Sequence, residues 1–150
     1  MSKHFQLLCA VHLILADGEN ILLSRRFNTG YEDGNFSLVA GHLNGGETAK
    51  GAMIREAREE AGIIICPNDL DIVLVMHRRV PETGQERIDY FLRSETWQGE
   101  IMNNEPDKCD LLEWHDANLL PKNIVQYVAR AISRHLNGVV FDSFGFGGDL

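Results

Sequence analysis

The sequence has few cysteines and no long hydrophobic segment. Cys9, Cys66 and Cys109 are the three cysteines of its 150 residues, and they form no CxxC pair. This odd number and wide spacing favour free thiols in a reducing compartment, and Cys9 and Cys66, which lie in apolar runs, are expected to fill the core. No run reaches the ~20 apolar residues that span a bilayer, and the apolar stretch Phe5–Ala16 lacks the flanks of a signal peptide. We therefore expect a cytoplasmic protein without membrane contact.

Positive charge is scarce as well, and no part of the sequence is compositionally biased. The 14 lysines and arginines are outnumbered by 22 aspartates and glutamates, which gives a formal net charge of −8. This balance argues against a general nucleic-acid-binding surface, and a polyanionic ligand meets an unfavourable field unless divalent cations intervene. No proline-rich, serine-rich or repetitive stretch marks a linker, so one domain is expected over residues 1–150.

Hydrophobic periodicity predicts short strands and two helices. The strands are expected at Phe5–Ala16, Ile21–Arg25, Phe36–Ala40, Ile63–Ile65, Leu70–His77, Arg87–Arg93 and Leu111–Trp114. Asp17-Gly18 predicts a hairpin turn, and the apolar run of residues 72–76 indicates burial on both faces of its strand. A second helix is expected between Pro121 and the stop signal Asn137-Gly138. The apolar stretch Val139–Phe146 is left open between a strand, a lid and a partner contact, and a homodimer is one such possibility.

The stretch Gly41–Ile63, GHLNGGETAKGAMIREAREEAGI, joins a glycine-rich loop to a helix with regularly spaced acidic residues. Glu56, Glu59 and Glu60 lie three and four positions apart and therefore share one face. Glu56 and Glu60 repel each other at this spacing, so a positive partner is expected against them. Three carboxylates and nearby backbone carbonyls suit a hard cation such as Mg²⁺ or Mn²⁺. The alternative is an ordinary solvated face on which Arg55 and Glu59 form a surface pair.

The opposite face of this helix is apolar. It carries Ala49, Met53, Ala57 and Ala61 at four-residue steps, which predicts that this face packs on the core. Gly62 follows the last turn, where a left-handed residue ends many helices. Because small side chains allow close packing, the helix is expected to hold its carboxylates in a fixed position.

The same stretch resembles the Nudix box, G-x5-E-x7-R-E-U-x-E-E-x-G-U. Gly41, Glu47 and the run from Arg55 to Ile63 match every fixed position, with Ala57 where a larger aliphatic residue is more frequent. The resemblance implies an α/β fold, namely an α/β/α sandwich with a mixed β-sheet between helices. It also implies an enzyme that hydrolyses a nucleoside diphosphate linked to another group, by attack of water on phosphorus.

Roles for the box residues follow from this resemblance. The implied ligands of Mg²⁺, or of Mn²⁺, are the Gly41 carbonyl and the carboxylates of Glu56, Glu59 and Glu60. Glu56 or Glu59 is expected to orient or deprotonate the attacking water. Arg55 is expected to brace the carboxylates through charge-assisted hydrogen bonds, and Glu47 to fix the junction between loop and helix.

Family members often add one acidic residue from a distant loop. Glu105, in the polar loop Trp97–Cys109, is the candidate, and Asp89 and Asp107 are weaker alternatives. The other interpretation of Glu105 is a plain turn residue beside Pro106.

Basic side chains near the predicted site are candidates for binding substrate phosphate. The resemblance implies this role for one of Arg25 and Arg26, whose guanidinium groups suit paired phosphate oxygens. Arg78, within the basic run His77–Arg79, is a third candidate. Exposed surface charge is the alternative for all of them.

Aromatic and histidine side chains leave two interpretations open. Trp97, Trp114 and Tyr31 can serve as platforms on which a base stacks, although large aromatic residues more often fill a core. His42 occupies a variable position of the box and either lies near substrate or is an ordinary loop residue.

Three functions are compatible with these features. The leading hypothesis is a (deoxy)nucleoside triphosphate pyrophosphohydrolase that releases a nucleoside monophosphate and pyrophosphate, because the chain carries an intact box without extensions. The alternative enzyme acts on ADP-ribose, nucleotide sugars or dinucleoside polyphosphates, but for ADP-ribose the proline expected after the box comes late, at Pro81. A non-catalytic nucleotide sensor is disfavoured because all box carboxylates are present. In each case the partner is a small-molecule nucleotide.

Overall fold

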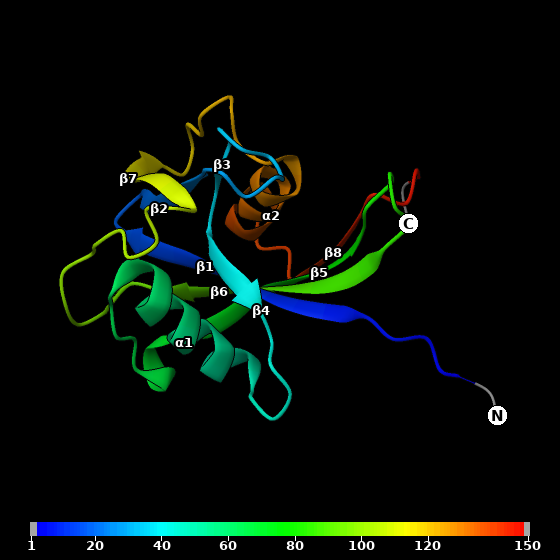
Figure 1. The fold of residues 1–150 in the computed structure, drawn as a ribbon, viewed down its shortest axis with the longest axis horizontal. Coiled ribbons are helices and arrows are strands. Elements are labelled where there is room, and N and C mark those ends of the chain that lie inside the picture. Colours follow the sequence, from blue (N-terminus) through cyan, green and yellow to red (C-terminus); the bar gives the residue numbers. More distant parts are fainter. Residues whose placement is uncertain (1–2, 149–150) are drawn as a thin grey trace.

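The computed structural model describes residues 3–148, which form eight strands and two α-helices (Figure 1). The strands are β1 (Leu8–Asp17), β2 (Asn20–Arg26), β3 (Phe36–Ser37), β4 (Val39–His42), β5 (Asp71–Arg79), β6 (Glu86–Ser94), β7 (Cys109–Asp116) and β8 (Phe141–Phe144). The helices are α1 (Ala49–Ala61) and α2 (Gln126–Leu136), and a short 3-10 helix spans Pro67–Asp69. Among the described residues, neither helix is long and apolar enough to cross a membrane. The last two residues of the chain lie outside the described range.

The described strands form one mixed sheet. Its order is β3-β2-β1-β6-β5-β8, with β4 paired to β1 and β7 paired to β2. β1 runs parallel to β6 and β5 runs parallel to β8, whereas the remaining neighbours are antiparallel. The predicted hairpin turn joins β1 and β2, where Asp17 pairs with Asn20 and Gly18 adopts a φ of 60°.

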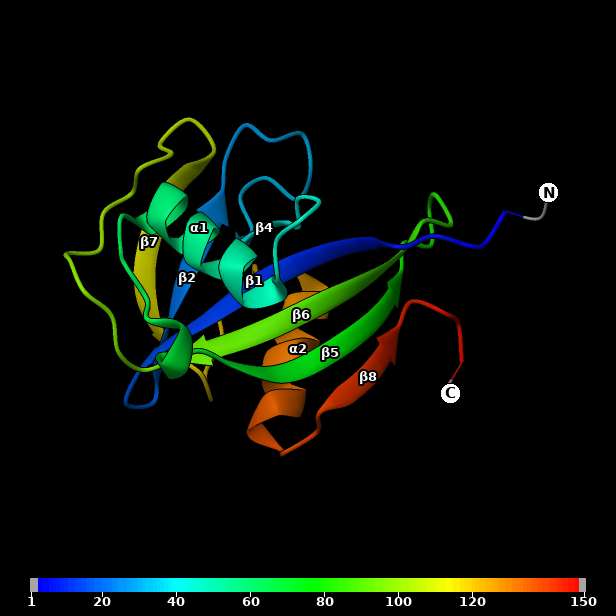
Figure 2. The same cartoon turned by 90° about the horizontal axis from the view of Figure 1, so that it is seen from below.

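The two helices cover opposite faces of the sheet (Figure 2). Strand β1 contributes to both layers, because successive side chains of a strand point to opposite faces. Val11, Leu13 and Leu15 pack in the core beneath α1, and Ile14 and Ala16 pack in the core beneath α2. This arrangement confirms the predicted α/β/α sandwich with a mixed sheet.

Helix α1 begins and ends where its sequence indicates. The Thr48 hydroxyl accepts a hydrogen bond from the Gly51 amide at 3.0 Å, which satisfies one of the free amides of the first turn. Gly62 ends the helix in the left-handed region, with a φ of 69°. The buried face consists of Ala52, Met53, Ala57 and Ala61. Three of these four were predicted, and the fourth, Ala52, takes the place expected for the half-buried Ala49.

Two predicted elements are displaced by contacts from distant parts of the chain. Residues 63–65 form only an isolated bridge between Ile64 and Gln98, and the buried side chains of Ile63 and Ile65 fill the core beneath α1. The second helix begins at Gln126 and not near Pro121, because Phe36 donates a hydrogen bond to the Asn123 carbonyl at 2.7 Å and ties this segment to β3.

Three further predictions about strands differ from the structure or are decided by it. The stretch predicted as one strand, Phe36–Ala40, divides into β3 and β4, which pair with different neighbours. In β5, Leu74 and Met76 are buried while Ile72 is 45% exposed, so the prediction of burial on both faces was wrong. Of the three options for the last apolar stretch, the strand is the one formed, as β8 pairs parallel to β5.

The three cysteines are free thiols in different environments. Cys109 is buried, Cys9 is partly buried and Cys66 is exposed. The prediction that Cys66 fills the core was therefore wrong, because it lies just before the short 3-10 helix, which contributes no buried residue.

Candidate active site

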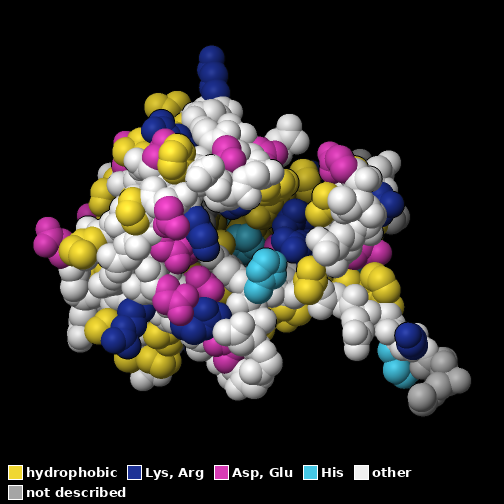
Figure 3. Space-filling model, viewed as in Figure 1, with side chains coloured by type: hydrophobic (Ala, Val, Ile, Leu, Met, Phe, Trp, Pro, Cys, Tyr) yellow, Lys and Arg dark blue, Asp and Glu magenta, His cyan; other side chains and the backbone are white. Residues whose placement is uncertain are grey.

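A cleft of about 1140 Å³ opens where β1 and β2 separate. The two strands pair only beside their turn, at Ala16 and Asp17, and β1 then pairs with β4 from Ala10 to Leu13. The walls of the cleft come from these strands, both helices and the loops around them. Acidic side chains gather on one side of the hollow, with basic side chains beside them, and histidine and further basic side chains lie within and across it (Figure 3).

The acidic wall is formed by α1 and one distant loop. Glu56, Glu59 and Glu60 line the cleft together with Glu105. Burial raises the pKa of Glu60 to about 8, and the charges of its three acidic neighbours add to the rise, although a hydrogen bond from the Ala40 amide at 2.9 Å opposes it. Burial also raises the pKa of Glu56, against the opposing effect of Arg55. Burial, helped by the neighbouring carboxylates, thus disfavours the charged forms of both side chains, and a bound cation would favour them.

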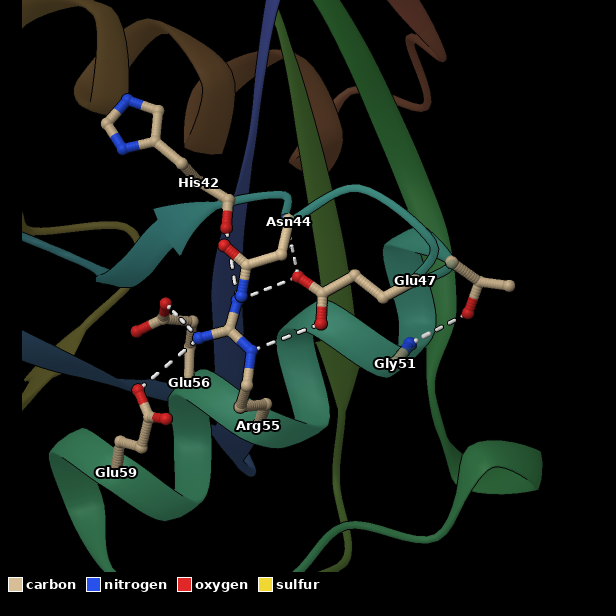
Figure 4. A network of polar contacts seen from close by, with 8 residues as sticks. His42, Asn44, Glu47, Gly51, Arg55, Glu56 and Glu59 are labelled. Atoms are coloured by element: carbon tan, nitrogen blue, oxygen red, sulfur yellow. Dashed lines mark hydrogen bonds and ion pairs between the residues drawn. The ribbon is translucent and has the colours of Figure 1, made fainter.

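Arg55 is the positive partner that the spacing of the glutamates requires (Figure 4). Its Nη1 donates to Glu56 at 2.7 Å and to Glu59 at 3.3 Å. Its Nε and Nη2 donate to the two carboxylate oxygens of Glu47 at 3.1 and 2.8 Å, and Nη2 also reaches the His42 carbonyl at 3.1 Å. These bonds lower the pKa of Glu47. Arg55 thereby joins the glycine-rich loop to the helix and holds two carboxylates, and it is not itself part of the cleft wall.

Gly41 allows the Glu56 carboxylate to lie directly against strand β4. A methyl group at this position would overlap the carboxyl carbon and Oε1 of Glu56. Glycine is needed here for space, because the backbone at Gly41 does not adopt a positive φ. Both residues line the cleft.

The basic wall lies across the cleft from α1. It includes Arg26, Arg78 and Arg87. Arg26 is tied to its own loop, because Nε donates to the Tyr31 carbonyl at 2.6 Å and Nη2 donates to the Thr29 hydroxyl at 3.1 Å. Arg78 is almost fully buried and donates through Nε to Asp89 at 2.7 Å.

Comparison with known proteins decides the family. The profile of the NUDIX domain matches residues 7–135, which is most of the chain. The chain belongs to the Nudix family. Its recognition from the box is therefore confirmed, and so is the predicted class of enzyme, a hydrolase that acts on pyrophosphate bonds.

Solved Nudix structures share the fold. A MutT NUDIX hydrolase from Burkholderia pseudomallei matches with a TM-score of 0.78 and 22% identity, over 86% of this chain and 98% of that chain. A MutT protein from Methanosarcina mazei matches with a TM-score of 0.72 and 18% identity, over 91% of this chain and 97% of that chain. At such identities the likeness is one of architecture.

A curated relative is larger than this chain. The NAD-capped RNA hydrolase NudC from Pseudomonas aeruginosa is 27% identical over 124 residues, which are 83% of this chain and 40% of that protein. The chain thus spans less than half the length of the curated relative that it matches.

The acidic wall fits the divalent cation that Nudix hydrolases generally use. Its donors are carboxylate and carbonyl oxygens, which hard cations prefer, and a cation would offset the negative charge of the carboxylates. Among residues 3–148, however, no three His, Cys, Asp or Glu side chains are gathered closely enough to surround a metal. The reason is visible in the contacts, since Arg55 holds Glu56 and Glu59 while the Ala40 amide holds Glu60. The residues match the cation in kind, while these hydrogen bonds hold the three carboxylates on other partners.

Of the candidate site residues outside the Nudix box, some line the cleft and others do not. Glu105 lines the cleft, whereas Asp89 lies buried behind it and Asp107 is an exposed loop residue. Arg25 is not part of the cleft wall, because it forms an ion pair with Asp110 at 2.8 Å.

The aromatic candidates also differ in whether they line the cleft. Trp97 and Trp114 pack against each other, with ring centroids 5.8 Å apart, and neither lines the cleft. Tyr31 does line it and is 47% exposed, with the Arg26 guanidinium 5.2 Å from its ring centroid. His42 lines the cleft as well, and its Nε2 lies 3.4 Å from Arg87 Nη2.

The sequence analysis missed several residues of the cleft wall, among them Arg87, His12 and Tyr127. His12 comes from β1 and Tyr127 from α2, and both are largely buried. A histidine within the apolar run of β1 is a signal that could have drawn attention to His12. Nothing local distinguishes Tyr127 from a core residue of an amphipathic helix.

Proposed function

We propose that this Nudix protein is a Mg²⁺-dependent pyrophosphohydrolase that converts a (deoxy)nucleoside triphosphate into a nucleoside monophosphate and pyrophosphate. The observation that carries the proposal is the acidic wall. Glu56, Glu60 and Glu105 converge on one cleft, and the pKa values of the first two are raised by burial and mutual repulsion. A bound cation would offset the negative charge of these carboxylates and allow the anionic phosphate chain to approach them.

The residues of the acidic wall would have different roles in the reaction. Glu56, Glu59, Glu60 and the Gly41 carbonyl would hold Mg²⁺, and Mn²⁺ suits the same donors. When bound, the cation neutralises phosphate oxygens and lowers the pKa of a bound water. Glu56 or Glu59 would orient the attacking water and accept its proton, and Arg55 holds both carboxylates in position.

The shape of the cleft supports a substrate with one nucleoside. One end carries the carboxylates, and the other end is closed by the buried side chains of His12, Arg78 and Tyr127. A triphosphate chain extends along the acidic wall while a single base and sugar occupy the closed end. Arg26 and Tyr31 also line the cleft and supply a cationic and an aromatic surface.

A second class of candidate substrate carries a further group beyond the phosphates of its nucleoside. The curated relative is described as an NAD-capped RNA hydrolase, and NAD joins two nucleosides through a diphosphate. In ADP-ribose, nucleotide sugars and dinucleoside polyphosphates, a nucleoside is likewise joined to a further group through a chain of two or more phosphates. The cleft is open enough for the second group to extend into solvent beside the exposed Tyr31.

A substrate panel with product identification tests the proposal. In Mg²⁺, the triphosphates should give monophosphate and pyrophosphate, and EDTA should stop the reaction. Glu59→Gln should lower kcat/KM by roughly 10²–10³-fold, because a charged group that stabilises the transition state is lost. The control is Glu19→Gln, at an exposed position in the β1–β2 turn. Products that arise only from dinucleotides or nucleotide sugars would instead support the second candidate.

A further inference from the structure

The closed end of the cleft contains a polar cluster that the proposed chemistry does not use. His12 from β1, Arg78 from β5 and Tyr127 from α2 all line the cleft at this end. Asp89 of β6 lies behind them and is completely buried. Four elements that are distant in sequence thus place their polar groups together.

Asp89 fixes both of its basic neighbours. It accepts a hydrogen bond from His12 Nε2 at 2.9 Å and another from Arg78 Nε at 2.7 Å. Burial raises the pKa of Asp89, but His12 and Arg78 outweigh that effect and lower it to about 2. The His12 ring also stacks on Phe91 at 4.7 Å, and the Arg78 guanidinium lies 3.7 Å from the centroid of the Tyr127 ring. Neither side chain is free to turn toward another partner.

This rigid cluster still contains polar atoms without a partner. Among the described residues, the buried side-chain nitrogen atoms that lack a hydrogen bond are His12 Nδ1, Arg78 Nη2 and Arg87 Nε. All three residues line the cleft, and the side chains of His12 and Arg78 are only 4% and 5% exposed. An unsatisfied buried polar atom costs about 1–3 kcal/mol, so their concentration around one cleft indicates a ligand that completes them. Because each atom is closed to solvent, a ligand reaches them only with a shift of the cleft wall.

The bonds to Asp89 determine what the two nitrogens offer. Arg78 Nη2 is a donor at any physiological pH. His12 donates Nε2–H to Asp89, so the neutral ring presents Nδ1 as an acceptor. A matching ligand therefore places an acceptor and a donor side by side. The edge of a nucleobase has this pattern, whereas a phosphate group offers acceptors only.

We propose that His12 and Arg78 form the recognition site for the hydrogen-bonding edge of the substrate's nucleobase. Asp89 is the positioning residue that orients the His12 and Arg78 side chains, and the Arg78 guanidinium packs over the Tyr127 ring. This proposal rests on the proposed function for the identity of the ligand as a nucleotide. It assigns Arg78 to the base, and the phosphate chain is left to the acidic wall.

A comparison of ligands with and without a base tests the proposal. Calorimetric titrations would use the four nucleoside monophosphates, ribose 5-phosphate as the base-free probe, and inorganic pyrophosphate, all in Mg²⁺. In the wild type, at least one monophosphate should bind more tightly than ribose 5-phosphate. His12→Phe keeps the stack on Phe91 but removes the acceptor, and it should weaken binding of that monophosphate about tenfold. Binding of ribose 5-phosphate and of pyrophosphate should stay within twofold.

A second test variant and a control variant distinguish loss of the recognition site from loss of the folded structure. Arg78→Lys keeps the charge but removes the guanidinium donor, and it should produce the same selective loss if His12→Phe does not fold. His77→Phe is the matched control, because His77 also contacts a carboxylate, Glu86 at 3.0 Å, and an aromatic ring, yet lies outside the cleft. Equal weakening of monophosphate and ribose 5-phosphate would overturn the proposal in favour of a phosphate site. Unchanged monophosphate binding would reduce the cluster to a structural role.

The titrations separate this proposal from the hydrolytic one. If no triphosphate is hydrolysed but the variants abolish the preference for a base, the recognition site stands and the proposed reaction fails. If triphosphates are hydrolysed and the preference survives in both variants, the reaction stands and the recognition site fails.

Discussion

At the scale of single residues, the position of Glu56 depends on the absence of a side chain at Gly41. The carboxylate lies against the main chain of β4, where Arg55 Nη1 holds it at 2.7 Å. Because the carboxylate is already held in place, it loses little further side-chain entropy when it binds a ligand.

Substitution of Gly41 by alanine should therefore damage the site more than the fold. The added methyl group would overlap the Glu56 carboxyl group and push it away. Because a displacement of about 1 Å can cost ~10²-fold in rate, we expect kcat/KM to fall about a hundredfold while the thermal unfolding midpoint changes little. Gly45→Ala in the same loop is the control, since no other atom lies within 4 Å of the place its methyl group would take, and its φ is not positive. Full activity in Gly41→Ala would remove Glu56 from the proposed mechanism.

Individual roles could be predicted from the sequence only where the geometry is local. Glu56, Glu59 and Glu60 share a face because helical spacing alone places them there. Arg25 and Arg26 could not be told apart, because the partner of Arg25 is Asp110, 85 positions away.

At the scale of elements, Asp89 links three adjacent strands of the sheet. It lies on β6 and bonds to His12 on β1 and to Arg78 on β5. A buried charge of this kind is destabilising to lose, because its removal leaves another charge without a partner.

The stability of the protein in acid should reflect this link. The pKa of Asp89 is lowered from 3.8 to about 2 in the folded state. As pH falls, Asp89 is therefore protonated in the unfolded chain before it is protonated in the folded protein. The stabilisation that the ionised Asp89 gives the folded state is present above about pH 4 and is lost toward pH 2. It amounts to roughly 2 kcal/mol. In urea unfolding, the wild type should exceed Asp89→Asn at pH 7, and the difference should narrow by about this amount at pH 2.

The exposed Asp107 provides the control for this measurement. Asp107→Asn should follow the wild type across the same pH range. If the difference between wild type and Asp89→Asn were the same at pH 7 and pH 2, ionisation of Asp89 would not stabilise the sheet.

The elements themselves could be predicted where a pattern is self-contained. Helix α1 has its cap, its apolar face and its terminal glycine within one stretch of sequence, and it was predicted nearly in full. Strand β8 was left open because its pairing partner, β5, lies more than 60 positions earlier. The start of α2 was misplaced because the segment before it is held by Phe36, which no local pattern reveals.

At the scale of the whole molecule, the fold brings together two walls of opposite charge that the sequence keeps apart. The acidic wall was predictable because one helix supplies most of it. The closed end draws His12, Arg78, Asp89 and Tyr127 from four elements, and their meeting depends on the order of strands in the sheet. Periodicity identifies a strand but not its neighbours, so this half of the cleft could not be predicted.

The protein has a formal net charge of −8, and binding of a cation can be measured as a change in the stability of the whole folded protein. A ligand that binds only the folded state stabilises it by about 2.7 kcal/mol at a hundred times its Kd. For a chain of this size, such a gain corresponds to a rise of roughly 5–10 °C in Tm. We expect Mg²⁺ to raise the Tm of the wild type, EDTA to reverse the rise, and the double variant Glu56→Gln/Glu60→Gln to lose it. KCl at matched ionic strength separates specific binding from screening of the negative charge. An equal rise in wild type and double variant would place the cation elsewhere on the surface and deprive the acidic wall of its proposed role.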